Sequence, residues 1–255
     1  MTYLILFASL ITLISVTYSF AVVKIGERAD SLKATVAKQN MQLLDAAVQE
    51  VAWSYGASKT VHMDDCGGTF RTEINARLLS INITDEHSFS TAIFNSHVGR
   101  VLYEFDTTGL VYENDFVKGD PQVIGNASSF TTTQLHVDVH DYRQLILAYR
   151  PTVSVSVAGV VNGKPLNLIR VYVINLNASQ SLVLAEKFQL KVSSLNVSRI
   201  SNQWEFNESI ASLTVEAFLD QNSGTVDVPI SSSVDGAVVN AEVVLCSARI
   251  QEPEV

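Results

Sequence analysis

The first 23 residues constrain the fold of this chain more than any other segment, because they carry no charged side chain. They read MTYLILFASLITLISVTYSFAVV, and the first charge is that of Lys24. A helix that rises about 1.5 Å per residue makes this run about 34 Å long, which is enough to cross the hydrocarbon core of a bilayer. We therefore predict that residues 1–23 form a transmembrane or filament-core helix.

A cleaved secretory signal is the alternative interpretation of this segment. Such a signal starts with basic residues, has a shorter apolar core and ends at a small-residue cleavage site, which would lie between Ser19 and Ala21 here. No basic residue precedes the apolar run, and the run is long for a signal. The pattern favours an anchor that is retained.

The helical pattern continues through residues 24–55. Charged and amide residues alternate with an apolar stripe at spacings of three and four, which is typical of an amphipathic helix. The stripe consists of Ile25, Ala29, Leu32, Val36, Met41, Leu44, Ala47, Val48 and Val51. Gly56 favours termination. We predict one continuous helix from about Thr2 to about Tyr55.

Residues 57–250 show the two-residue period of half-buried strands, as in Val153-Ser-Val155-Ser-Val157. Asn162-Gly163 predicts a tight hairpin, Asp235-Gly236 a second turn, and Pro229 an edge strand. These signals predict an α+β chain in which one long N-terminal helix precedes an antiparallel β-sandwich. Residues 251–255 form a polar tail.

Charge and motifs limit the possible functions. The formal net charge of −9 disfavours nucleic acid as a partner, because an acidic surface repels phosphate backbones. The sequence has no GxSxG, HExxH, Walker or GxGxxG pattern, so we expect neither an enzyme nor a cofactor. His136, Asp138 and His140 would share one face of a strand and are possible metal ligands. With no further ligand near them in the sequence, a solvated strand face is the preferred interpretation, and we expect no metal.

The two cysteines, Cys66 and Cys246, lie near the two ends of the predicted β domain. They are either two buried free thiols or one disulfide that closes a long loop. The chain-entropy model gives such a disulfide about 5 kcal/mol of stabilisation. The sequence leaves both arrangements open.

The side of the membrane on which the β domain lies is indicated by two opposing signals. Lys24, Arg28, Lys33 and Lys38 follow the apolar run, which by the positive-inside rule places the domain in the cytoplasm. Five Asn-x-Ser/Thr sequons are glycosylation candidates and favour the outside. They are Asn82, Asn126, Asn177, Asn196 and Asn207. We expect an extracellular domain, since removal of a basic leader before Met1 would mislead the charge rule.

The order of these parts resembles that of type IV pilins, and of archaeal pilin-like surface proteins in particular. The resemblance is carried by residues 1–23, their amphipathic continuation and the β-rich region from Thr60. It implies that the apolar helix sits in membrane lipid before assembly and then packs with copies of itself in a filament core. It also implies an immunoglobulin-like sandwich and N-linked sugars on the outside. Ile5 departs from the family, because bacterial pilins usually carry a glutamate there.

Two functions follow as expectations. The first is a structural subunit of a pilus-like filament, whose helix packs through Ala8, Ser15, Leu32, Val36 and Leu44. The second is a signal-anchored extracellular binding or adhesion module that does not polymerise. An accessory subunit of a surface complex is a third, weaker option.

Overall fold

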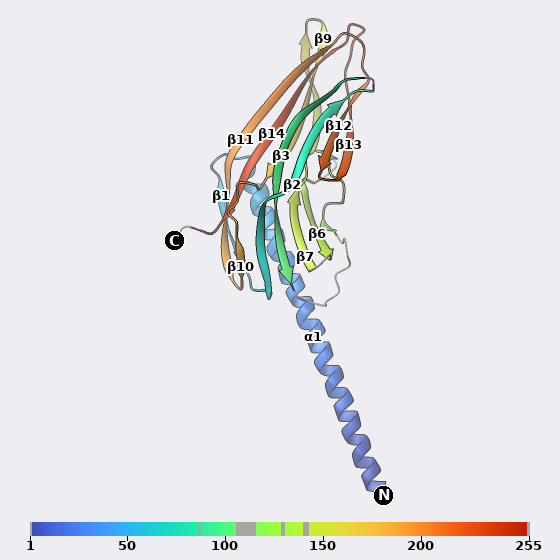
Figure 1. Ribbon diagram of the computed structural model, residues 1–255, viewed down its shortest axis with the longest axis vertical. Helices are drawn as coiled ribbons and strands as arrows, with labels where there is room; N and C mark the ends of the chain where they lie inside the picture. The colour runs from blue at the N-terminus through green and yellow to red at the C-terminus, as the bar shows by residue number, and fades with distance from the viewer. Residues whose placement is uncertain (1, 87, 106–115, 129–130, 140–142, 254–255) are drawn as a thin grey trace.

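The computed structural model describes residues 2–86, 88–105, 116–128, 131–139 and 143–253. It begins with one long helix, α1 (Thr2–Val51), which is followed by a mostly antiparallel β domain (Figure 1). The predicted continuous helix is therefore confirmed, but it ends at Val51 instead of near Tyr55. The chain leaves the helix because Gly56 N donates to Ser194 O at 2.9 Å and Ser194 N donates to Ala57 O at 2.9 Å. These strand-like hydrogen bonds replace the next helical turn.

The described strands form two curled sheets. The first sheet has six strands in the order β1-β11-β14-β9-β8-β5, and the second has the path β13-β12-β2-β3-β7-β6-β4 with β10 beside β2. The first comprises β1 (Ser58–Met63), β11 (Phe188–Phe206), β14 (Ala237–Gln251), β9 (Lys164–Asn175), β8 (Thr152–Val161) and β5 (Gly125–Asn126). The second comprises β13 (Asn222–Pro229), β12 (Ser212–Leu219), β2 (Gly68–Thr84), β3 (Ser90–Phe105), β7 (Arg143–Tyr149), β6 (Thr133–Val139), β4 (Phe116–Lys118) and β10 (Val183–Ala185). Pairing is antiparallel except between β9 and β14 and between β5 and β8.

Two apolar cores divide the β domain along its length. The helix-proximal core contains the buried side chains of α1 together with Phe70, Tyr103, Leu145 and Cys246. The distal core lies between the two sheets, beyond the part of the domain that contacts α1, and includes Ile81, Val171, Val215 and Val243. The strands β2, β3, β9 and β14 contribute to both cores, so the two halves of the domain are continuous.

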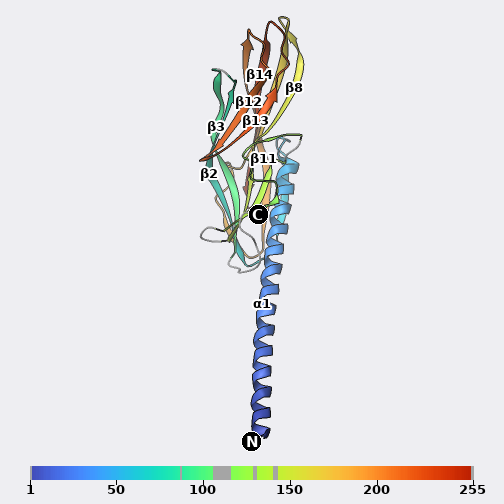
Figure 2. The ribbon, with the colours of Figure 1, turned by 90° about the vertical axis from the view of Figure 1, so that its right-hand side faces the viewer.

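Only the C-terminal part of α1, from Ala34 to Val51, packs on the β domain. Its first buried side chain is Ala34, and Met41, Leu44 and Val48 are fully buried in the helix-proximal core. The helix runs along one flank of the domain and then projects well beyond it (Figure 2). We call residues 2–33 the projecting segment, and between Phe7 and Lys33 none of its side chains is buried.

A buried carboxylate fixes the contact between α1 and the second sheet. Asp45 Oδ2 lies 2.6 Å from Lys118 Nζ, and Asp45 Oδ1 accepts hydrogen bonds from Thr133 Oγ1 at 2.7 Å and Tyr149 OH at 3.2 Å. Burial, followed by the charge of Asp45, raises the pKa of Tyr149, so its hydroxyl stays protonated and can donate. One turn earlier, Asn40 exchanges two hydrogen bonds with the backbone of Asp64.

The predicted turns and edge are confirmed. Asn162 and Gly163 have φ values of 52° and 81° and connect β8 to β9 as a two-residue hairpin loop. Gly236, with φ of 103°, lies in the turn before β14. Pro229 ends β13, which lies at an edge of its sheet, where a residue that cannot donate a ladder hydrogen bond is tolerated.

The Asp45 contacts give a prediction about stability. Asp45→Ala removes the acceptor of two buried hydroxyl groups and the partner of Lys118, which is only partly buried. We expect a loss of about 2–4 kcal/mol in the free energy of unfolding, measured from the urea midpoint of the β domain. The control is Gln42→Ala on the exposed side of the same helix. A loss no greater than that of the control would contradict the assigned role of Asp45.

Candidate functional site

The projecting segment exposes apolar side chains all around the helix. Between Phe7 and Lys33 every side chain is exposed except that of Asp30, which is half-buried. In the described part of the chain, one helix, α1, is long enough and apolar enough to cross a membrane. Its most apolar stretch is not buried by the rest of the chain. The exposed large apolar residues of the segment are Tyr3, Phe7, Leu10, Ile11, Leu13, Ile14, Val16, Tyr18, Phe20, Val22, Val23, Ile25 and Leu32. An apolar surface of this extent needs lipid or protein around it.

Hydroxyl groups on the projecting segment do not make it polar. Thr12 Oγ1 donates to Ala8 O at 2.9 Å, and Thr17 Oγ1 donates to Leu13 O at 2.8 Å. Each hydroxyl is thus satisfied within the helix and costs little in an apolar medium. A shallow apolar depression of ≈ 330 Å³ lies on the same segment and is lined by Leu13, Ile14, Thr17, Tyr18 and Ala21.

A charged collar, residues 24–33, separates the apolar run from the β domain. Lys24 Nζ lies 2.6 Å from Glu27 Oε2 and 5.8 Å from the centre of the Phe20 ring, so the first charge of the chain folds back over the last aromatic ring. At about 1.5 Å per residue the collar holds the domain about 15 Å from the apolar run. The helix therefore has an apolar part, a charged spacer and a docked part.

The five predicted helix-packing residues separate into two groups. Leu44 is 0% exposed and Val36 packs partly against the same core, so both contact the β domain of their own chain. Ala8 and Ser15 are exposed, and Leu32 is 67% exposed. A second copy of the chain can therefore reach Ala8, Ser15 and Leu32 but not Leu44.

Asp45 was not predicted as a functional or structural residue. A signal was nevertheless present in the sequence: Asp45 lies four residues after Met41 and three before Val48, inside the apolar stripe. A carboxylate that lies among the apolar positions of an amphipathic helix needs hydrogen-bond or ion-pair partners when that face of the helix is buried. The partners, Lys118, Thr133 and Tyr149, lie on strands far along the chain and could not be named in advance.

The predicted sequons differ in accessibility. Asn126, Asn196 and Asn207 are exposed, whereas Asn82 and Asn177 are half-buried. Asn82 lies in β2 between its paired neighbours Ala92 and Glu216. At Asn126 the side-chain Oδ1 accepts hydrogen bonds from Ser128 N at 3.0 Å and Ser128 Oγ at 2.7 Å. This Asx turn presents the acceptor amide and the sequon hydroxyl together at the surface.

Cys66 and Cys246 are both free thiols buried in the helix-proximal core. Of the two arrangements left open by the sequence, the disulfide is not formed in this structure. Cys246 Sγ lies 3.9 Å from the Oγ of Ser194. Ser194 lies in β11 and forms backbone hydrogen bonds with Gly56 and Ala57, just after α1. Burial raises the pKa of both thiols, and a neutral thiol is a poor nucleophile.

The predicted histidine and aspartate pattern shows no metal site in the described part of the chain. His136 and Asp138 lie in β6, and His140 lies outside the described residues. The described residues contain no cluster of three or more His, Cys, Asp or Glu side chains that could hold a metal ion. The ring of His136 instead stacks on Phe116, with centroids 5.1 Å apart.

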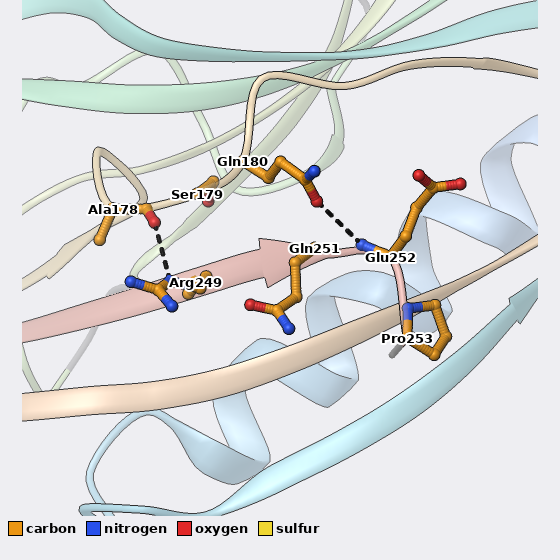
Figure 3. Close-up of a pocket in the computed structure, with 7 residues that line it drawn as sticks. All are labelled: Ala178, Ser179, Gln180, Arg249, Gln251, Glu252 and Pro253. Carbon is orange, nitrogen blue, oxygen red and sulfur yellow. Dashed lines mark hydrogen bonds between the residues drawn. The ribbon is translucent and has the colours of Figure 1, made fainter. Parts of the chain in front are cut away.

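A polar depression of ≈ 580 Å³ lies beside the end of β14 (Figure 3). Arg249 Nε donates to Ala178 O at 3.2 Å, and Glu252 N donates to Gln180 Oε1 at 3.4 Å. Ser179 Oγ accepts a hydrogen bond from Ile250 N at 3.1 Å. These groups join the loop after β9 to the last strand, which gives the depression a structural role.

No protein-family model, no curated protein sequence and no solved structure matches this chain.

The sequon geometry predicts which asparagine carries sugar. In protein from its native host we expect occupancy at Asn126 and an unmodified Asn82, because a bulky sugar needs an accessible amide. Glycopeptide mass spectrometry would measure both. Ser128→Ala should remove the mass of one glycan and leave the other sites unchanged. Sugar on Asn82 with none on Asn126 would contradict the prediction.

The buried thiols give a second prediction. At pH 8 and in the folded chain, Cys66 and Cys246 should react with iodoacetamide more slowly than in urea by at least an order of magnitude, since their raised pKa and burial both suppress thiolate attack. Intact mass after timed quenching would report the number of labelled thiols. Rapid labelling of either thiol in the folded chain would show that the core opens there.

Proposed function

We propose that this chain is a structural subunit of a pilus-like surface filament, assembled through the projecting segment of α1. The observation that carries the proposal is the continuity of one helix that projects from the β domain up to Lys33 and packs on it from Ala34 to Val51. The projecting segment exposes its apolar side chains on all sides, whereas Asp45 and its partners hold the rest of the helix on the β domain. The proposal assigns the chain no catalytic role.

The two environments that suit the projecting segment fit this function. Before assembly, lipid covers the apolar side chains, and the charged collar lies in the headgroup region. In a filament the same side chains are covered by the helices of other copies. The apolar side chains therefore remain in apolar surroundings when the subunit moves from the membrane into the filament. Small residues such as Ala8 and Ser15 allow close approach between helix backbones, and the depression at Thr17 and Ala21 can receive a side chain of a neighbour.

The proposed location is the cell surface, with the β domain outside. Exposed sequons at Asn126, Asn196 and Asn207 support this location, because sugars are added to secreted or external segments. We also propose that the domain is an immunoglobulin-like sandwich, as in the archaeal pilin-like proteins that the chain resembles. The apolar cores between the curled sheets support a sandwich, whereas the parallel pairing of β9 with β14 is a feature that the immunoglobulin arrangement does not require.

A signal-anchored binding module that works singly is the alternative. It needs the projecting segment only as an anchor, so neither the small residues nor Leu32 would have a partner. The two functions therefore differ in what happens when small residues are enlarged without loss of hydrophobicity.

The discriminating variant is Ala8→Leu combined with Ser15→Leu. We expect it to reach the membrane fraction normally, since hydrophobicity rises, but to form few or no filaments, because the larger side chains keep helices apart. Electron microscopy of sheared surface material, together with membrane fractionation, would measure both properties.

The matched control is Val16→Leu combined with Val22→Leu, which adds volume to the same segment at positions that are already bulky. It should assemble like the parent. If the Ala8 and Ser15 variant also assembles like the parent, packing through these residues is wrong. If neither the parent nor any variant assembles under native expression, the anchored module replaces the filament subunit.

A further inference from the structure

A pocket of ≈ 510 Å³ lies at the junction of the two halves of the β domain, away from α1. Its lining includes Arg77 from β2, Phe116 from β4, His136 from β6, Leu219 from β12 and Asn222 from β13. His136 points to the opposite face of β6 from Leu135 and Val137, which belong to the helix-proximal core. The volume is in the range of sites that hold small organic ligands.

An irregularity in β2 places Arg77 in this pocket. Between Glu73 and Arg77 the strand advances four residues, while its partner β3 advances two, from Arg100 to Val98. Such bulges redirect side chains and often lie beside functional sites. After the bulge, Arg77 lies opposite Val98 and on the same face as Leu79 and Ile81, which are buried in the distal core. The guanidinium of Arg77 is thereby held at the edge of the distal core.

Among the described residues, the guanidinium of Arg77 has no hydrogen-bond or ion-pair partner. Three carboxylates attract its charge without pairing with it, and each is engaged elsewhere. Glu73 pairs with Arg100 at 2.6 Å, Asp220 Oδ1 accepts from Leu78 N at 2.9 Å, and Asp138 also has a partner of its own. Burial, and then the like charge of Arg100, lowers the pKa of Arg77, which means that its charge is held at an energetic cost. An anion in the pocket would relieve that cost.

Two aromatic rings and an aliphatic side chain line the pocket together with Arg77. The rings of Phe116 and His136 stack at an interplanar angle of 26°, and Leu219 adds an aliphatic surface. Burial lowers the pKa of His136, so the ring is uncharged at neutral pH and its Nδ1 has no hydrogen-bond partner in the described part of the chain. Asn222 is exposed and supplies an amide at the rim. Thus one cation, one pair of stacked rings and one amide line the same pocket.

We propose that this pocket binds a carboxylate carried on a six-membered ring, of the size of a sugar acid. The carboxylate pairs with the guanidinium of Arg77, as the planar fork of arginine favours. The face of the ring packs on Phe116 and Leu219, and ring hydroxyls reach the amide of Asn222. An aromatic acid shares the carboxylate and the flat ring but lacks the hydroxyl groups. The proposal does not depend on filament formation, because every residue involved belongs to one chain.

The test is isothermal titration calorimetry of the full chain in uncharged detergent with sodium glucuronate, glucose, benzoate and sodium sulfate. We expect saturable one-to-one binding of glucuronate and at least tenfold weaker binding of glucose. Binding of benzoate in place of glucuronate would support the site and identify its ring as aromatic. Binding of sulfate alone, equal binding of glucose and glucuronate, or no binding of any probe would overturn the proposal.

Two variants assign the binding to this pocket. Arg77→Gln should weaken the glucuronate or benzoate complex at least tenfold, with the urea midpoint measured on the same sample to show that the chain is folded. Asn222→Asp places a negative charge on an exposed rim position, where folding is not at stake, and should also weaken binding. Arg249→Gln, at the depression beside the end of β14, is the matched control and should bind like the parent. Unchanged binding by both pocket variants would overturn the assignment.

Discussion

The structure depends on the packing of the C-terminal part of α1, from Ala34 to Val51, in the helix-proximal core. Apolar side chains such as Met41, Leu44 and Val48 provide most of the burial, but apolar contact alone is not directional. Asp45 supplies the direction, since its two oxygens must meet Lys118, Thr133 and Tyr149 at once. Only one rotation and one height of the helix satisfy all three. The orientation of the projecting segment relative to the β domain follows from this contact.

The shape of the β domain follows from strands that are long enough to serve two cores. β2 contributes Phe70 to the helix-proximal core and Ile81 to the distal core, with its bulge between them. The bulge allows the sheet to change curvature without ending the strand. It also places Arg77 in the pocket that His136 and Asn222 line. The candidate ligand pocket is therefore a consequence of how one sheet covers two cores.

Much of the fold was predictable because its signals are local. The uncharged run before Lys24, the apolar stripe and the Asn162-Gly163 turn each depend on neighbouring residues, and each appears in the structure. The sheet order, the parallel pairing of β9 with β14 and the partners of Asp45 depend on contacts between distant segments. Periodicity does not encode such contacts. For the same reason the sequence could not show that Leu44 is buried within its own chain or that Arg77 and His136 line one pocket.

The lengthwise course of β11 and β14 has a mechanical consequence. They pair over most of their length, from Lys191 opposite Gln251 to Phe206 opposite Ala237, and β11 is joined at its lower end to β1, which follows α1. A pull on the far tip of the domain acts parallel to these strands and loads many backbone hydrogen bonds at once instead of opening them one by one. Because Cys66 and Cys246 form no covalent bridge, that tension is borne by the ladder of hydrogen bonds and passed on to the helix. The domain is thus built to resist shear along its long axis.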